Sequence, residues 1–244
     1  MQSHLSLIKT GTQDLEKRIF PRFPFSYLLF KASSCDEITF EVKDISYTGM
    51  QICLKDGGHT FRNSEKIEGI LNWRGKDLKI DGSIKWVKGQ RVGVAFSASA
   101  EFESKIKDYL SIKNIVSSMR PLHAAGLELE TPVDLKYWLQ ADGPVEVFVW
   151  QHNDGDISKF QLILMDSFIE YQDGKGLRSG RVLTKRDLET PLVHEDEFVF
   201  EIDSTISAER LDFAKDLVRH IPASFLPAEV NGYLKLKLGI IGEN

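Results

Sequence analysis

Two arginines and the polar end of a predicted strand are the residues whose types and spacing best fit a chemical task. Arg18 and Arg22 lie four residues apart, and Asp44 and Ser46 follow across one predicted strand. A guanidinium is a permanently charged, forked donor that fits phosphate oxygens and the O6/N7 edge of guanine. A carboxylate can accept hydrogen bonds from the N–H groups on guanine's Watson–Crick edge. Together these side chains predict a site for an anionic guanine nucleotide.

The order of the two motifs makes the signal specific. They read Glu16-Lys17-Arg18-Ile19-Phe20-Pro21-Arg22 and Lys43-Asp44-Ile45-Ser46-Tyr47-Thr48-Gly49. RxxxR followed by DxSxxG, with the strand pattern that comes after it, resembles the PilZ family, the bacterial receptors for cyclic di-GMP. The resemblance covers residues 13–118. It implies a small β-barrel whose ligand is cyclic di-GMP and which needs no cofactor.

The resemblance also implies a role for each motif residue. Arg18 and Arg22 are expected to clamp the ligand by its phosphates and guanine. Asp44 and Ser46 are expected to read guanine, and Gly49 to supply a positive-φ turn or a close backbone approach that admits the base.

One departure from the family pattern concerns the residue before RxxxR. Many family members have a further arginine there, whereas this chain has Lys17. Lysine keeps the positive charge but not the planar fork that stacks on a base. Whether one ligand or a stacked pair binds therefore stays open.

The elements that must position these residues follow from the hydropathy pattern. Period-two alternation predicts strands over 25–31, 37–46, 50–54, 67–73, 78–86 and 92–96. Six antiparallel strands with one buried face predict a small closed barrel, followed by a helix over 97–119. Because Ile45 breaks the alternation, a bulge near Asp44 is expected to turn the polar pair outward. Trp86 shares the apolar parity of its strand, which favours core packing over base stacking.

The rest of the chain predicts a second domain of α+β type, so the whole is mainly β plus α+β. The expected division is a lead-in at 1–12, the barrel domain at 13–118, a linker at 119–125 and the second domain at 126–244. In that domain the pattern predicts helices over 131–139 and 207–220, and strands over 145–150, 160–165, 169–172, 181–183, 198–202 and 233–238. This second half resembles no family.

Charge divides the chain in the same way. Residues 1–125 carry 19 lysines and arginines against 14 acidic residues, and residues 126–244 carry 12 against 22. The front half suits an anionic ligand, whereas the acidic half would repel nucleic acid and acidic membranes and suits a basic protein partner. With no apolar run long enough for a membrane span and no secretory signal, a cytoplasmic location is expected.

Candidate catalytic and metal-binding residues do not form a recognisable pattern. The histidines are scattered, Cys35 and Cys53 lack metal-ligand spacing, and Ser167 and Ser179 lack a nucleophile-elbow context. No catalytic or metal site is therefore expected, and a non-enzymatic receptor is the first hypothesis. The alternatives are an enzyme whose C-terminal domain the ligand regulates, and a PilZ-like adaptor that binds proteins only.

Overall fold

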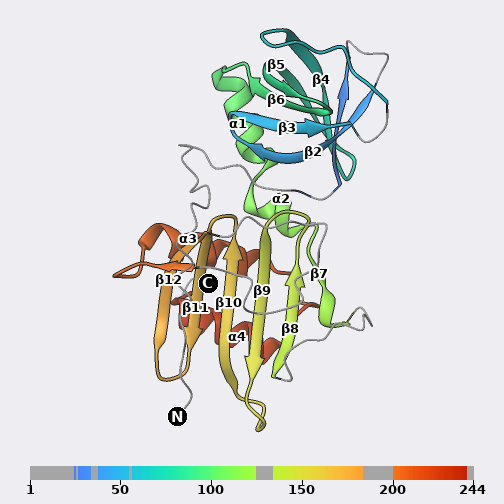
Figure 1. The fold of residues 1–244 in the computed structure, drawn as a ribbon. Coiled ribbons are helices and arrows are strands. Elements are labelled where there is room, and N and C mark those ends of the chain that lie inside the picture. The colour runs from blue at the N-terminus through green and yellow to red at the C-terminus, as the bar shows by residue number, and fades with distance from the viewer. Residues whose placement is uncertain are drawn as a thin grey trace.

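The computed structural model describes residues 25, 27–33, 38–54, 57–124, 134–183 and 200–240. They form an N-terminal β-barrel and a C-terminal sheet with helices on one face (Figure 1). No helix within these ranges is both long and apolar enough to cross a lipid bilayer. The fold is mainly β with α+β character, in agreement with the sequence prediction.

The N-terminal part is a closed, six-stranded antiparallel barrel. Its strands are β1 (Leu28–Ala32), β2 (Thr39–Ser46), β3 (Gly49–Cys53), β4 (Lys66–Trp73), β5 (Lys76–Lys88) and β6 (Arg91–Phe96). They lie around the barrel in the order β1-β2-β3-β6-β5-β4, and each neighbouring pair is antiparallel. Alternate residues point inward and are fully buried, among them Phe30, Phe40 and Ile80. The predicted barrel is confirmed.

Two short helices follow the barrel where the sequence predicts one helix over 97–119. Helix α1 (Ala100–Tyr109) begins after Ser99, and α2 (Ile112–Val116) begins after Ser111. In each case the serine hydroxyl accepts a hydrogen bond from a backbone N–H of the first turn. A serine satisfies the free donors at a helix start, so the second cap favours a new helix over continuation of the first. Helix α2 lies between the barrel and the sheet (Figure 1).

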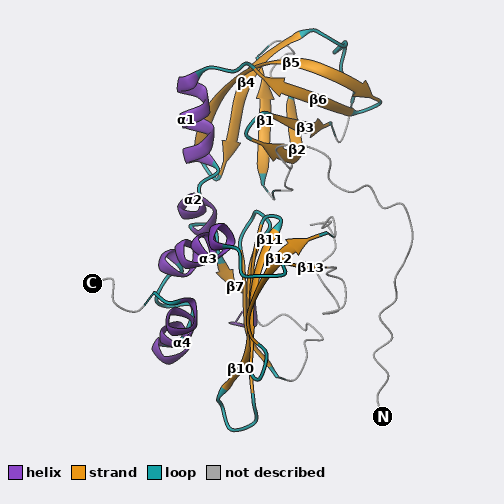
Figure 2. Ribbon diagram, turned by 90° about the vertical axis from the view of Figure 1, so that its left-hand side faces the viewer, coloured by secondary structure: helices purple, strands orange, loops and turns teal. Residues whose placement is uncertain are grey.

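The C-terminal part is a seven-stranded antiparallel sheet. Its strands are β7 (Arg120–Pro121), β8 (Leu135–Gln140), β9 (Val145–Gln151), β10 (Ile157–Leu164), β11 (Ser167–Gln172), β12 (Gly176–Val182) and β13 (Phe200–Ile202), side by side in chain order. Helices α3 (Ala208–His220) and α4 (Ala228–Leu238) cover one face of it (Figure 2). Helix α3 packs on β10, β11 and β12, and α4 packs on β10.

Two predicted elements of this part are wrong. Residues 135–139 of the predicted helix belong to strand β8, and the predicted strand over 233–238 is the second half of helix α4. Helix α4 buries Val230, Leu234 and Leu238 at intervals of four residues, the spacing of one helix face.

The stretch 119–125, expected to be a linker, is part of the C-terminal fold as far as residue 124. Strand β7 pairs with β8, and residues 122–124 form the 3₁₀ turn η1 (Leu122–Ala124). Met119, which precedes β7, is buried. Pairing with a sheet edge satisfies backbone groups that an exposed connection would leave to water. The chain therefore passes from α2 directly into the sheet.

The largest hydrophobic core is continuous across both parts. It includes Leu28 and Ile80 of the barrel, Ile106 of α1, Val147 of the sheet and Leu217 of α3. A second cluster lies on the opposite face of the sheet and consists of Trp138, Phe148, Trp150, Ile163 and Phe168. Burial of apolar surface in one continuous core stabilises the barrel and the sheet against each other.

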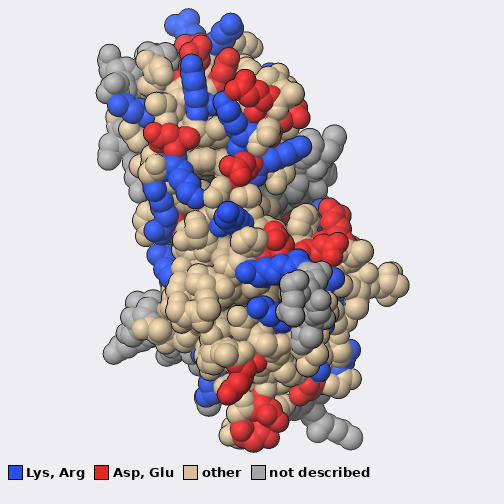
Figure 3. Space-filling model, turned by 180° about the vertical axis from the view of Figure 1, so that it is seen from behind, with Lys and Arg blue, Asp and Glu red and all other residues tan. Residues whose placement is uncertain are grey.

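Charged side chains of both signs alternate over the barrel on the face that Figure 3 shows. Strand β5 illustrates the pattern, because the exposed Lys79 and Lys85 alternate with the exposed Asp77 and Asp81. The positive excess of the front half is therefore not gathered into a single-sign patch on this face.

Candidate functional site

Only some of the predicted site residues lie in the part of the chain that the structure describes. Lys17, Arg18 and Arg22 lie outside the described residues. Asp44, Ser46 and Gly49 lie in the hairpin that joins β2 to β3.

A bulge in β2 decides which way Asp44 points. Val42 pairs with Ile52, but the next pair is Asp44 with Gln51, so Lys43 is the extra residue. Ile45 is fully buried in the barrel interior, and its neighbour Asp44 therefore projects from the outer surface. The bulge that the sequence predicts near Asp44 is confirmed.

Ser46 and Gly49 pair with each other across the two-residue turn of the hairpin. The Ser46 hydroxyl donates to the Gly49 carbonyl at 3.2 Å and accepts from the Thr48 N–H at 3.4 Å, and Ser46 is 3% exposed. Gly49 opens β3 in an extended conformation and is not among the positive-φ glycines. In this structure the hydrogen bonds of Ser46 stabilise the turn. Gly49 contributes only backbone atoms to it.

A second bulge, in β5, turns Trp86 onto the same outer surface. Ile84 pairs with Val94 and Trp86 with Gly93, which leaves Lys85 as the extra residue. Both neighbours of Gly93 in β6 are fully buried, so the side-chain position of Gly93 faces outward. A Cβ added to Gly93 would lie 2.1 Å from the indole Nε1 of Trp86. The indole therefore covers Gly93 from outside, and the prediction of core packing for Trp86 is wrong.

The two bulges place their residues in one row across four strands. Asp44 pairs with Gln51, Gln51 with Gly93, and Gly93 with Trp86. We call these four residues the outer row. Neighbouring strands are about 4.8 Å apart, so Asp44 and Trp86 are separated by roughly 14 Å along the barrel surface.

A second row, of small residues, runs beside the outer row. It consists of Ser46, Gly49, Ala95 and Ser83, which are paired in that order across β2, β3, β6 and β5. Ser46 and Gly49 of this row are buried, and Ala95 and Ser83 are partly exposed. A carboxylate at one end of the outer row can accept from a base N–H, and an indole at the other end can stack on a base.

Residues 16–111 match the family profile that describes the PilZ domain. The barrel is a PilZ domain. The match ends near α2, and the C-terminal sheet and its helices lie outside it. No curated protein matched the chain. The predicted family and its extent are thus confirmed for the barrel.

The chain enters the PilZ barrel beside the C-terminal sheet. Phe25 is 5% exposed and packs edge-on against Trp73 of β4, with ring centroids 5.3 Å apart. Tyr27 is exposed and has a φ of 60°, and the guanidinium of Arg74 lies over its ring at 5.4 Å. The first described residues after the arginine motif are therefore held at the junction of the two parts.

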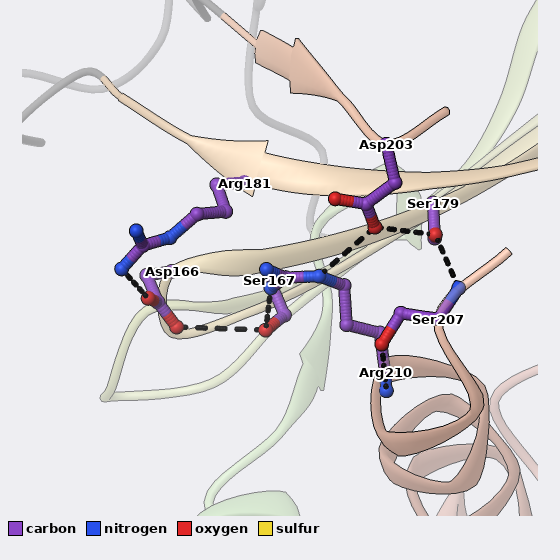
Figure 4. A network of polar contacts seen from close by, with 7 residues as sticks. All are labelled: Asp166, Ser167, Ser179, Arg181, Asp203, Ser207 and Arg210. Atoms are coloured by element: carbon purple, nitrogen blue, oxygen red, sulfur yellow. Dashed lines mark hydrogen bonds and ion pairs between the residues drawn. The ribbon is translucent and has the colours of Figure 1, made fainter. Parts of the chain in front are cut away.

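The most extensive polar network of the C-terminal part is shown in Figure 4. Ser179 donates to Asp203 at 2.6 Å and accepts from the backbone N–H of Ser207, the N-cap of α3. Arg210 donates to Asp203 at 3.1 Å and to the Ser167 hydroxyl at 2.8 Å. The network joins the start of α3 to β11 and β12, and its serines are engaged in that contact.

The described residues contain no group of three or more His, Cys, Asp or Glu side chains that could hold a metal ion. The sequence motifs identified the acidic side of the outer row. They did not identify Trp86, because the bulge at Lys85 leaves no mark in the alternation where Trp86 and Val87 are both apolar. The pairing of a tryptophan with a glycine in the next strand was the available signal.

Proposed function

We propose that the protein is a bacterial, cytoplasmic receptor for cyclic di-GMP that binds its ligand on the outer surface of the PilZ barrel. The proposal rests on the four residues of the outer row. Asp44 accepts from the Watson–Crick edge of guanine, and the Trp86 indole, which covers Gly93 two strands away, supplies a stacking surface. A cyclic dinucleotide carries two bases on one ring, so one base can meet the carboxylate while the other stacks on the indole.

The arginine motif supplies positive charge, which none of the four residues of the outer row carries. Arg18 and Arg22 bind the phosphates and guanine of the ligand through forked, charge-assisted hydrogen bonds. Lys17 adds a positive charge without a planar fork. Ser46 supports the site by holding the β2–β3 turn, in which it pairs with Gly49.

The output of binding is a change in how the two parts of the chain are arranged or in which protein they bind. The C-terminal half, with 22 acidic residues against 12 basic ones, suits a partner with a basic surface. A pull-down with and without cyclic di-GMP identifies that partner. Recovery of the same proteins in both conditions would contradict ligand-dependent partner choice.

Isothermal calorimetry of the full chain with cyclic di-GMP tests the proposal. Micromolar or tighter binding is expected, and the titration gives the number of ligands per chain. Cyclic di-AMP is the matched control, because adenine lacks the N1–H and the 2-amino group that a carboxylate reads on guanine. Folded protein that ignores cyclic di-GMP at high concentration would leave the non-binding adaptor as the better description.

We expect Trp86→Ala to weaken cyclic di-GMP binding about five- to a hundredfold, since stacking on an aromatic side chain contributes roughly 1–3 kcal/mol per base. Trp86→Phe keeps a ring and should retain most of the affinity. Stacking should also quench indole fluorescence in the wild type, and this quenching should largely disappear in Trp86→Phe. Equal affinities for all three proteins would remove Trp86 from the site.

A further inference from the structure

The ring of Phe25 is enclosed by both parts of the chain. Trp73 of the barrel contacts it edge-on at 5.3 Å. On the other side lies Gly143, in the turn between β8 and β9 of the C-terminal sheet. A Cβ added to Gly143 would lie 2.7 Å from Cε1 of Phe25 and 3.0 Å from Cζ. The ring thus rests directly on the backbone of the sheet, with no room for even a methyl group.

Asp142, the residue before Gly143, holds the barrel residues that pack against Phe25. Asp142 is fully buried and accepts from the indole Nε1 of Trp73 at 3.2 Å. It also accepts from Nε of Arg74 and, at 2.9 Å, from the Nη2 of the same guanidinium. Its own backbone N–H donates to the Ser118 hydroxyl at 3.0 Å. The β8–β9 turn and the β4–β5 hairpin are therefore tied together around Phe25.

Arg74 and Gly75 form the two-residue turn of the β4–β5 hairpin, a kind of turn that takes a positive φ at both positions. Arg74 has a φ of 49° and is followed by Gly75 at 81°. A non-glycine residue in the left-handed region costs on the order of 1 kcal/mol. The hydrogen bonds that Arg74 donates to Asp142 offset this cost, and they raise the pKa of Arg74 above its already high ordinary value.

Chain connectivity carries the constraint to the arginine motif. Only Phe23 and Pro24 separate Arg22 from Phe25. Three residue steps span at most about 11 Å, so the position of Phe25 limits where the Arg22 guanidinium can reach.

We propose that Phe25 is a positioning residue for the ligand site and that Gly143 of the C-terminal sheet forms half of the surface that holds it. The inference rests on the proposed binding of cyclic di-GMP and assigns the C-terminal part a share in the affinity. Because such coupling is reciprocal, bound ligand also stabilises the contact between Phe25 and the sheet. A change in packing near residue 143 should therefore change the affinity for the ligand, and bound ligand should change the stability of that packing.

Gly143→Ala tests the inference with a single methyl group in the part of the chain that carries no motif residue. The added Cβ must displace the Phe25 ring, and we expect cyclic di-GMP to bind about tenfold more weakly in calorimetry. Gly232→Ala is the matched control, since its added Cβ meets nothing within 4 Å and should leave affinity unchanged. Circular dichroism and thermal unfolding check that both variants are folded.

A double variant separates positioning from a general loss of structure. In Phe25→Leu a smaller side chain leaves space for the methyl group at position 143. The double variant should therefore bind better than the two single effects predict when added, a non-additivity confined to residues in contact. Additive effects, or a Gly143→Ala protein that binds like the wild type, would overturn the inference. A wild-type protein that does not bind cyclic di-GMP would instead overturn the proposed function.

Discussion

Arg22→Ala should abolish micromolar binding of cyclic di-GMP by the full chain. A hydrogen bond to a charged group contributes roughly 1.5–3 kcal/mol, so loss of one forked arginine weakens binding about ten- to a hundredfold or more. Two such bonds to a phosphate or to the guanine edge would be lost together. Isothermal calorimetry measures the change.

Two further variants show whether the effect belongs to the arginine fork. Arg22→Lys keeps the charge but not the planar pair of donors, and its affinity should fall between those of Arg22→Ala and the wild type. Arg62→Ala removes an exposed arginine from the loop before β4 and should bind normally. Unchanged affinity in Arg22→Ala would exclude the motif from the site.

Asp142→Ala should produce the largest loss of stability among single substitutions at the junction. Its removal leaves the buried indole N–H of Trp73 without its acceptor, which costs about 1–3 kcal/mol. Arg74 also loses its partner, but its side chain is 47% exposed and water replaces part of that interaction. We expect a loss of about 2–3 kcal/mol, and a Tm lower by roughly 5–10 °C for a chain of this size.

Thermal and urea unfolding measure this change, and two variants calibrate it. Asp142→Asn keeps an acceptor for Trp73 and should lose less stability than the alanine variant. Asp212→Ala removes a carboxylate that is 75% exposed and paired only with Lys215, so it should change stability by under about 0.5 kcal/mol. If Asp142→Ala unfolds at the wild-type temperature, the buried carboxylate does not hold the parts together.

The barrel could be predicted from the sequence because a half-buried strand has an apolar residue at every second position. The alternation over Ile38, Phe40 and Val42 and over Leu78, Ile80 and Ile84 specified both the strands and their inward faces. The break at Ile45 even marked one bulge. The bulge at Lys85 gave no such sign, since Trp86 and Val87 are both apolar and either could face inward.

The errors in the C-terminal part have a related cause. The run Tyr233 to Leu238 alternates apolar and polar residues, yet it is helical because Val230, Leu234 and Leu238 face the core and Leu236 is left 56% exposed. Tertiary packing outweighed the local pattern there. Contacts over long sequence distances, such as that between Trp73 and Asp142, leave no local signal at all.

The shared core limits how the PilZ barrel can be used by itself in protein engineering. A fragment that ended at residue 118 would keep every motif residue and all six barrel strands. It would also expose Phe25 and Trp73 on the side that Gly143 and Asp142 now cover. A biosensor or chimera built from the barrel alone therefore needs a graft of the β8–β9 turn to keep these two aromatic rings covered.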